Sequence, residues 1–191
     1  MKKEIRGLFI FGAIVLPLYA ILVICVSTGT IIASYSGFAL DNNGFLYVGE
    51  NHEINVYGNG EFIKTVYKPA RGYSFTIQDE TLYVADAGIV RKMDLEGNLI
   101  EKSDDIGTIE MNRLYRQRNM FVTNDAKYMA NGIFGYYKIT KYKNGGGTEI
   151  VYQSPLFTLV FQIAGTIGFV SFVLLVLAVR FRLLPFKKAK T

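Results

Sequence analysis

The sequence predicts a membrane protein in which two transmembrane α-helices flank an extracytoplasmic antiparallel all-β domain of blade-like hairpins. Three observations predict this fold class. Each end of the chain contains a long uncharged apolar run, and the middle alternates short runs of β-branched and aromatic residues with glycine and asparagine. A weak repeat recurs along the middle part. We therefore expect basic tails at 1–7 and 181–191, helices at 8–32 and 154–180, and the β domain at 33–153.

The first apolar run starts at Leu8 behind a basic start, and no charged residue follows until Asp41. A cleaved secretory signal has the same order of features. However, its apolar part is typically about 7 to 15 residues long, and this run is longer, which favours an uncleaved anchor. Pro17 lacks the donor for a helical hydrogen bond and is a candidate kink. The only cysteine, Cys25, follows Ile24 rather than the small residue that precedes an acylated cysteine, and it leaves no second cysteine for a disulfide.

The second apolar run extends from Leu156 to Val179 without a charge. At about 1.5 Å per helical residue it would reach ~36 Å, enough to cross a ~30 Å hydrocarbon layer. Ser154 is a candidate N-cap, Pro155 suits the first helical position, and Arg180 follows the run. A buried core helix is the alternative interpretation.

The net charge of +5 comes from the two ends of the chain. Residues 1–7 and 180–191 together carry +7, so the residues between them carry −2. This balance argues against nucleic acid as a partner, because a basic surface is the main source of that affinity. Since Lys and Arg are retained on the cytoplasmic side, both termini are expected in the cytoplasm, the central domain outside it, and the lipid bilayer of the plasma membrane around the helices.

The middle part shows the punctuation of strands and hairpins. Glycine and asparagine clusters at 42–44, 58–60, 96–98 and 144–147 supply residues that tolerate positive φ. The pieces between them, such as 53–57 and 136–142, are too short and too β-branched for helices. Lys138 and Thr140 flank Ile139, an alternation that predicts one solvated sheet face.

The repeat consists of LYVGENHEINVYGNGEFI from Leu46, LYVADAGIVRKMDLEGNLI from Leu82 and, more loosely, KYMANGIFGYYKITKYKNGGGTEIV from Lys127. These units resemble blades of the NHL and related six-bladed β-propeller families, whose pattern is Leu-Tyr-Val followed by Asp-x-x-Gly-Asn-Leu-Ile. The match is closest from Leu82 to Ile100, fair from Leu46 to Ile63 and loose in the third unit. The resemblance implies a binding platform. The chain departs from those families because it has room for only about three blades, which we expect near 37–68, 73–102 and 113–153. Because propellers close with about 4 to 8 blades, one copy cannot close a ring, and we expect self-association or a membrane-protein partner.

Catalytic chemistry has little support in the residues. His52 is the only histidine, and no serine lies in a Gly-x-Ser-x-Gly elbow. The acidic clusters at 41–44 and 103–105 do not follow the EF-hand pattern, so we expect turns there. We expect no catalytic residues, no cofactor and no metal site.

Two groups of residues are candidates for interaction. Tyr115 lies among three arginines, Arg113, Arg116 and Arg118, a combination that suits an acidic partner or lipid headgroups. In the second apolar run, Ala164 and Gly168 form a small-xxx-small pair that would admit close approach of another helix.

These observations favour a membrane-anchored binding or accessory protein that presents its β domain to a protein or ligand. One alternative is an accessory or sensor subunit of a transporter or signalling complex, because the short tails leave no room for an output domain. The other alternative is an extracytoplasmic hydrolase.

Overall fold

A computed structural model shows two compact units, which are described separately. The structure describes residues 3–28, 35–70, 72–103, 119–133 and 136–180. The helical unit comprises Met1–Ile31 and Leu159–Thr191, and the β unit comprises Ile32–Thr158.

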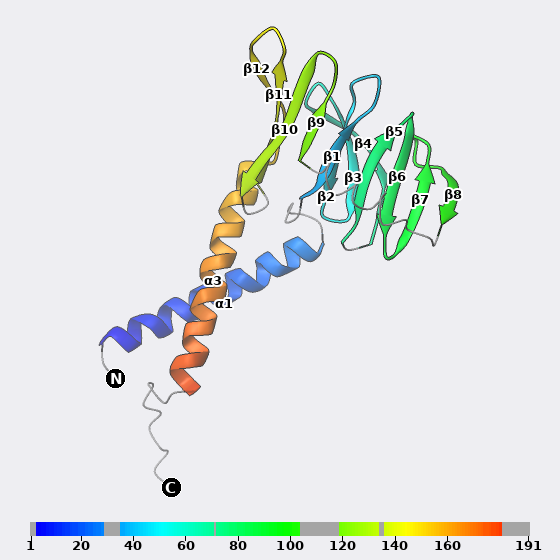
Figure 1. Ribbon diagram of the computed structural model, residues 1–191. Helices are drawn as coiled ribbons and strands as arrows, with labels where there is room; N and C mark the ends of the chain where they lie inside the picture. The colour runs from blue at the N-terminus through cyan, green and yellow to red at the C-terminus, as the bar shows by residue number, and fades with distance from the viewer. Residues whose placement is uncertain (1–2, 29–34, 71, 104–118, 134–135, 181–191) are drawn as a thin grey trace. The chain divides into compact units, whose positions relative to one another are not determined.

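The β unit consists of three four-stranded antiparallel sheets, and in each sheet the strands pair in chain order (Figure 1). The first sheet contains β1 (Tyr35–Leu40), β2 (Leu46–Glu50), β3 (Glu53–Gly58) and β4 (Glu61–Tyr67). The second contains β5 (Ser74–Gln78), β6 (Thr81–Asp86), β7 (Ile89–Met93) and β8 (Leu99–Ser103). The third contains β9 (Met120–Val122), β10 (Ala126–Ile133), β11 (Tyr136–Lys143) and β12 (Thr148–Gln153). The prediction of blade-like hairpin units is confirmed.

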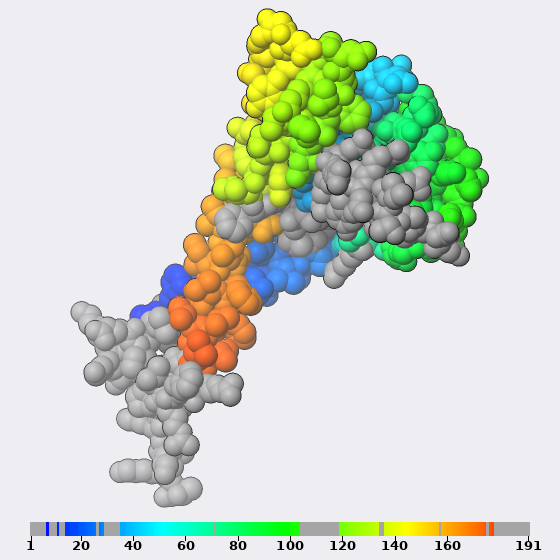
Figure 2. All heavy atoms as spheres, viewed as in Figure 1, coloured from blue at the N-terminus to red at the C-terminus, as the bar shows by residue number. Residues whose placement is uncertain are grey.

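The first sheet lies between the other two, so its two faces serve two different cores. Every residue of β1 and β2 is buried. Because side chains alternate between faces, Leu46 and Val48 join a core with the third sheet, whereas Tyr47 joins a core with the second. Figure 2 shows part of the first sheet, in cyan, between atoms of the third sheet, in yellow-green, and those of the second, in green. The alternation seen in the sequence of the third sheet predicted one solvated sheet face, but β1 and β2 are buried on both faces.

Each core is built from alternate residues of the facing strands. The core between the first and second sheets includes Ile54 on one side and Phe75, Leu82 and Met93 on the other. The core between the first and third sheets includes Phe38 on one side and Ile139 and Tyr152 on the other. Apolar surface buried in these two cores stabilises the β unit by about 25 cal/mol per Å².

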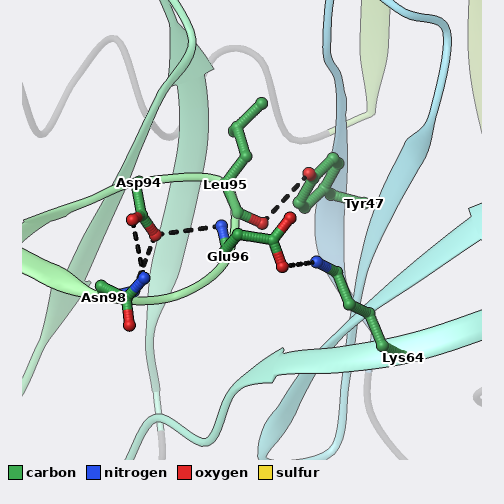
Figure 3. Close-up of polar contacts among 6 residues, drawn as sticks. All are labelled: Tyr47, Lys64, Asp94, Leu95, Glu96 and Asn98. Carbon is green, nitrogen blue, oxygen red and sulfur yellow. Dashed lines mark hydrogen bonds and ion pairs between the residues drawn. The ribbon is translucent and has the colours of Figure 1, made fainter.

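The turn between β7 and β8 fastens the second sheet to the first (Figure 3). Asp94 organises this turn, because its carboxylate accepts the backbone N–H groups of Glu96 at 3.0 Å and Asn98 at 2.8 Å. The turn then contacts the first sheet: Glu96 forms an ion pair with Lys64, and Tyr47 donates to the Leu95 carbonyl at 3.5 Å.

Gly97 completes this contact, because its backbone lies directly on β4. Its φ is +91°, and a Cβ atom there would lie 2.3 Å from the carbonyl oxygen of Val66. The Asp-x-x-Gly-Asn segment at 94–98 is therefore a docking turn in which the aspartate holds the loop and the glycine permits close approach.

The helical unit contains α1 (Lys3–Ser27) and most of α3 (Leu156–Arg180). The two helices meet at small residues of α3. A Cβ atom at Gly165 would lie 1.9 Å from Leu22 Cδ2, and one at Gly168 would lie 3.1 Å from Tyr19 Cβ. The rings of Tyr19 and Phe169 lie 6.4 Å apart. Many other described apolar side chains of both helices are exposed.

Over the residues that the structure describes, neither helix contains an apolar segment long enough to cross a membrane. The prediction of two transmembrane helices is therefore wrong. A crossing needs about 20 consecutive, predominantly apolar residues. The sequence interpretation placed such helices at 8–32 and 154–180. In the structure α1 starts at Lys3 and ends at Ser27 and α3 starts at Leu156 and ends at Arg180, and the described residues of neither helix supply such a segment.

Candidate functional site

A cleft of about 150 Å³ lies where the first and third sheets face each other. One wall is a row of three residues that pair across β1, β2 and β3, namely Leu40, Leu46 and Tyr57. The opposite wall is the matching row across β10, β11 and β12, namely Tyr128, Lys141 and Glu149. The lining also includes Asn59, Gly60, Ile150 and Val151.

The two rows follow from strand register. Residues directly opposite each other on paired strands point to the same face, so one inward residue fixes the direction of its two neighbours. Leu46 is buried on the inner face, and it brings Leu40 and Tyr57 to that face with it. A space of this volume has room for a single ring or a short side chain.

Tyr57 is held in place by a buried carboxylate. Its hydroxyl lies 3.0 Å from both carboxylate oxygens of Glu50, which is only 5 % exposed. Tyr152, on the third sheet, also donates to Glu50, and Asn55 donates from Nδ2 at 2.7 Å. Thr65 in turn donates to Asn55 Oδ1 at 2.7 Å, which fixes the amide. Four strands thus support one wall of the cleft.

This network keeps its tyrosines protonated. Burial raises the pKa of both Tyr57 and Tyr152, and the negative charge of Glu50 raises each further. The two rings also contact each other edge to face, with centroids 5.0 Å apart. Neutral hydroxyl groups that donate to a carboxylate position the wall, but neither is poised to act as a base.

Lys141 supplies the positive charge of the cleft. Its ammonium group lies 5.4 Å from the centroid of the Tyr128 ring, and hydrogen bonding to Tyr128 raises the pKa of Lys141. Glu149 pairs with Lys143 at 3.2 Å, and its charge, together with that of Asp125, adds to the raised pKa of Lys141. Among the ion pairs of the described residues, none includes Lys141, so its charge is available to a ligand.

A second buried carboxylate lies outside the cleft. Asp86 accepts from the backbone N–H of Ala70 at 3.0 Å and from Arg91 at 3.3 Å through Oδ2, while its buried Oδ1 has no hydrogen-bond partner among the described residues. Arg91 also lies over the Tyr67 ring, 5.9 Å from its centroid. These contacts fasten β6 to the end of the first sheet, so we assign Asp86 a structural role.

The residues predicted as sites from the sequence lie elsewhere. Arg113, Tyr115, Arg116 and Arg118 fall outside the described residues. Gly168 lies against Val15 and Tyr19 of α1, whereas Ala164 is exposed and its neighbour Gly165 makes the other close contact. His52 is exposed in the turn between β2 and β3. In the described part of the chain, no three metal-ligating side chains come together.

The sequence contained one signal for the network. Leu46, Val48 and Glu50 alternate along β2, so a carboxylate shares the face of two buried apolar residues. A buried carboxylate needs donors, but the sequence does not show that Tyr152 supplies one from 102 residues away.

Comparison with known proteins adds little to this description. No protein-family model matches the chain, and no curated protein matches it in sequence. Among solved structures, glutaminyl cyclase from Myxococcus xanthus matches with a TM-score of 0.33 and 14 % identity over 62 % of this chain. The match spans about half of that enzyme, 51 % of its length.

Proposed function

We propose that the β unit is a binding module whose cleft takes a small group in which a carboxylate adjoins a ring or a short apolar chain. The observation that carries this proposal is the cleft itself, with its apolar row of Leu40 and Leu46, the positioned Tyr57 ring and the cationic Lys141. Sites for small ligands combine apolar walls with a few placed polar groups in this way.

The sheets support this proposal at a coarser level. Asp94 and Gly97 dock the β7–β8 turn on the first sheet, and the NHL-type blades that this segment resembles usually form binding platforms. We therefore favour binding over the hydrolase alternative, because the described lining of the cleft includes no serine, cysteine or histidine. The location of the β unit outside the cytoplasm stays a prediction.

Benzoate is a suitable probe, because it places one carboxylate beside one ring. Saturation-transfer NMR with the full-length protein should detect binding with a dissociation constant of about 1 mM, the affinity of a fragment of this size. Benzylamine, which has the same ring and the opposite charge, should bind more weakly because Lys141 repels it.

Two lysine variants locate the binding. Lys141→Gln should weaken benzoate binding by about threefold to tenfold, the effect of one partly exposed ion pair. Lys127→Gln is the matched control. Lys127 is exposed and precedes Tyr128 in β10, so its side chain points to the face of the sheet away from the cleft. Equal binding of benzylamine, or an unchanged affinity in Lys141→Gln, would contradict the proposal.

A further inference from the structure

The two contacts between sheets run in the same direction around the β unit. In each, the turn between the third and fourth strands of one sheet lies beside the fourth strand of the next. The β7–β8 turn of the second sheet meets β4, where a Cβ atom at Gly97 would lie 2.3 Å from the Val66 carbonyl oxygen. The β3–β4 turn of the first sheet meets β12, where a Cβ atom at Gly60 would lie 3.8 Å from the Val151 carbonyl oxygen.

The third sheet ends in a turn of the same construction. In the β7–β8 turn, Asp94 N–H donates to the Asn98 carbonyl at 3.0 Å and Gly97 N–H to the Asp94 carbonyl at 3.1 Å. In the β11–β12 turn, Lys143 N–H donates to the Gly147 carbonyl at 3.2 Å and Gly146 N–H to the Lys143 carbonyl at 3.0 Å.

The two central glycines also share their backbone conformation but differ in surroundings. Gly97 has a φ of +91° and Gly146 a φ of +89°. A Cβ atom at Gly146 would meet nothing within 4 Å, whereas one at Gly97 would strike β4. The β11–β12 turn therefore has the form of a docking turn, with no strand of the described chain beside its glycines.

The second sheet has the complementary feature, a fourth strand, β8, that no turn of the described residues covers. The first residues of β4, β8 and β12 are all exposed. Towards their ends, β4 is half-buried at 64–67 and β12 is covered at Val151 and Tyr152, but β8 stays exposed through Lys102. In the described part of the chain, the β11–β12 turn is thus docked on no strand, and β8 has no turn docked on it. These two features lie at opposite ends of the row of three sheets.

The positions that would meet at these two ends can be identified from strand register. Glu101 on β8 corresponds to Lys64 on β4, because each is paired with the equivalent residue of its third strand, Lys92 or Val56. In the existing contact, Lys64 of the strand pairs with Glu96 of the turn. At the other ends, Glu101 pairs with Lys92 of its own sheet at 2.6 Å, and the turn position that corresponds to Glu96 is Gly145.

From these features we propose that two copies of this chain associate head to tail, with the β11–β12 turn of each docked on β8 of the other. The same two surfaces meet twice, so the assembly closes on itself as a two-fold dimer. It contains six sheets, within the range of about 4 to 8 at which propellers close. This dimer is independent of the cleft, which each copy contains in full.

Crosslinking of the full-length protein tests the arrangement directly. In a Cys25→Ser background, Gly145→Cys places a thiol on the turn at the position that corresponds to Glu96, and Glu101→Cys places one on β8. Gly145 has open space around it and no positive φ. The two variants, carrying different affinity tags, are co-expressed and treated with a short bismaleimide.

The matched pair should give at least about tenfold more mixed-tag dimer than Gly145→Cys paired with Lys127→Cys, because docked thiols react at an effective concentration near millimolar. Sedimentation velocity should also show a species of twice 21.5 kDa. A matched pair that yields no more crosslinked dimer than the control pair would overturn the head-to-tail arrangement, even if another contact dimerises the chain. A mass of a single chain across the micromolar range would overturn the association altogether.

Discussion

At the scale of single residues, the seam between the first and third sheets depends on how Glu50 is satisfied. Three side chains donate to this carboxylate, from β3 and β12. Removing it leaves those donors buried without an acceptor, which costs more than the loss of one exposed ion pair.

Glu50→Ala should therefore lower the free energy of unfolding by about 3 to 5 kcal/mol, as measured by urea denaturation. Glu61→Gln, at an exposed position in β4, should change it by less than about 0.5 kcal/mol. If both variants unfold at the same urea concentration, Glu50 does not stabilise the seam.

From the environment of Tyr47 we predict a second effect, a loss of stability in alkaline solution. Burial raises the pKa of Tyr47 to about 12, with smaller contributions from Asp41, Glu96 and Glu80. The unfolded chain releases this proton near pH 10, before the folded chain does, so the stabilisation is complete below pH 10 and is lost as the pH rises towards 12. Unfolding free energies measured from pH 8 to 12 should fall over this range, and Tyr47→Phe should fall less steeply. Equal slopes in the two proteins would exclude Tyr47 as the cause.

At the scale of elements, the docking turn predicts a contrast between two glycines. Gly97 and Gly88 have φ values of +91° and +82°, so alanine is strained at both by about 1 to 2 kcal/mol. Only at Gly97 does the added Cβ atom meet the backbone of another strand. Gly97→Ala should thus destabilise the protein by at least about 2 kcal/mol more than Gly88→Ala. Equal losses, measured by thermal and urea unfolding, would show that β4 moves aside.

The hairpins were predictable because glycine and asparagine mark their turns. The cleft was not, because its walls come from six strands that the sequence separates by up to about a hundred residues, and strand pairing within a sheet does not specify which sheets face each other. For the helices, composition identified the apolar runs but not the helix ends. It did not show that α1 includes Lys3 and ends at Ser27.

At the scale of the whole molecule, the middle position of the first sheet predicts how stability is distributed. The second strand of each sheet, β2, β6 or β10, is paired on both sides, and burial of these strands decreases in that order. Amide hydrogen exchange should be slowest in β2 and at least about tenfold faster in β10, because local opening is easier where fewer side chains are buried. Mass spectrometry of peptides from the three strands measures this order, and faster exchange in β2 than in β10 would contradict it.

The order of the sheets along the chain also determines when each one is synthesised. The first sheet leaves the ribosome before either of its neighbours, although both of its faces end up covered. Two of the donors to Glu50, Asn55 and Tyr57, belong to the first sheet, but the third, Tyr152, comes 102 residues after Glu50. At about 5 to 20 residues per second, the nascent first sheet has to wait roughly 5 to 20 s with an apolar face uncovered and with Glu50 lacking this donor. That interval is when this chain would depend on a chaperone that holds nascent strands apart.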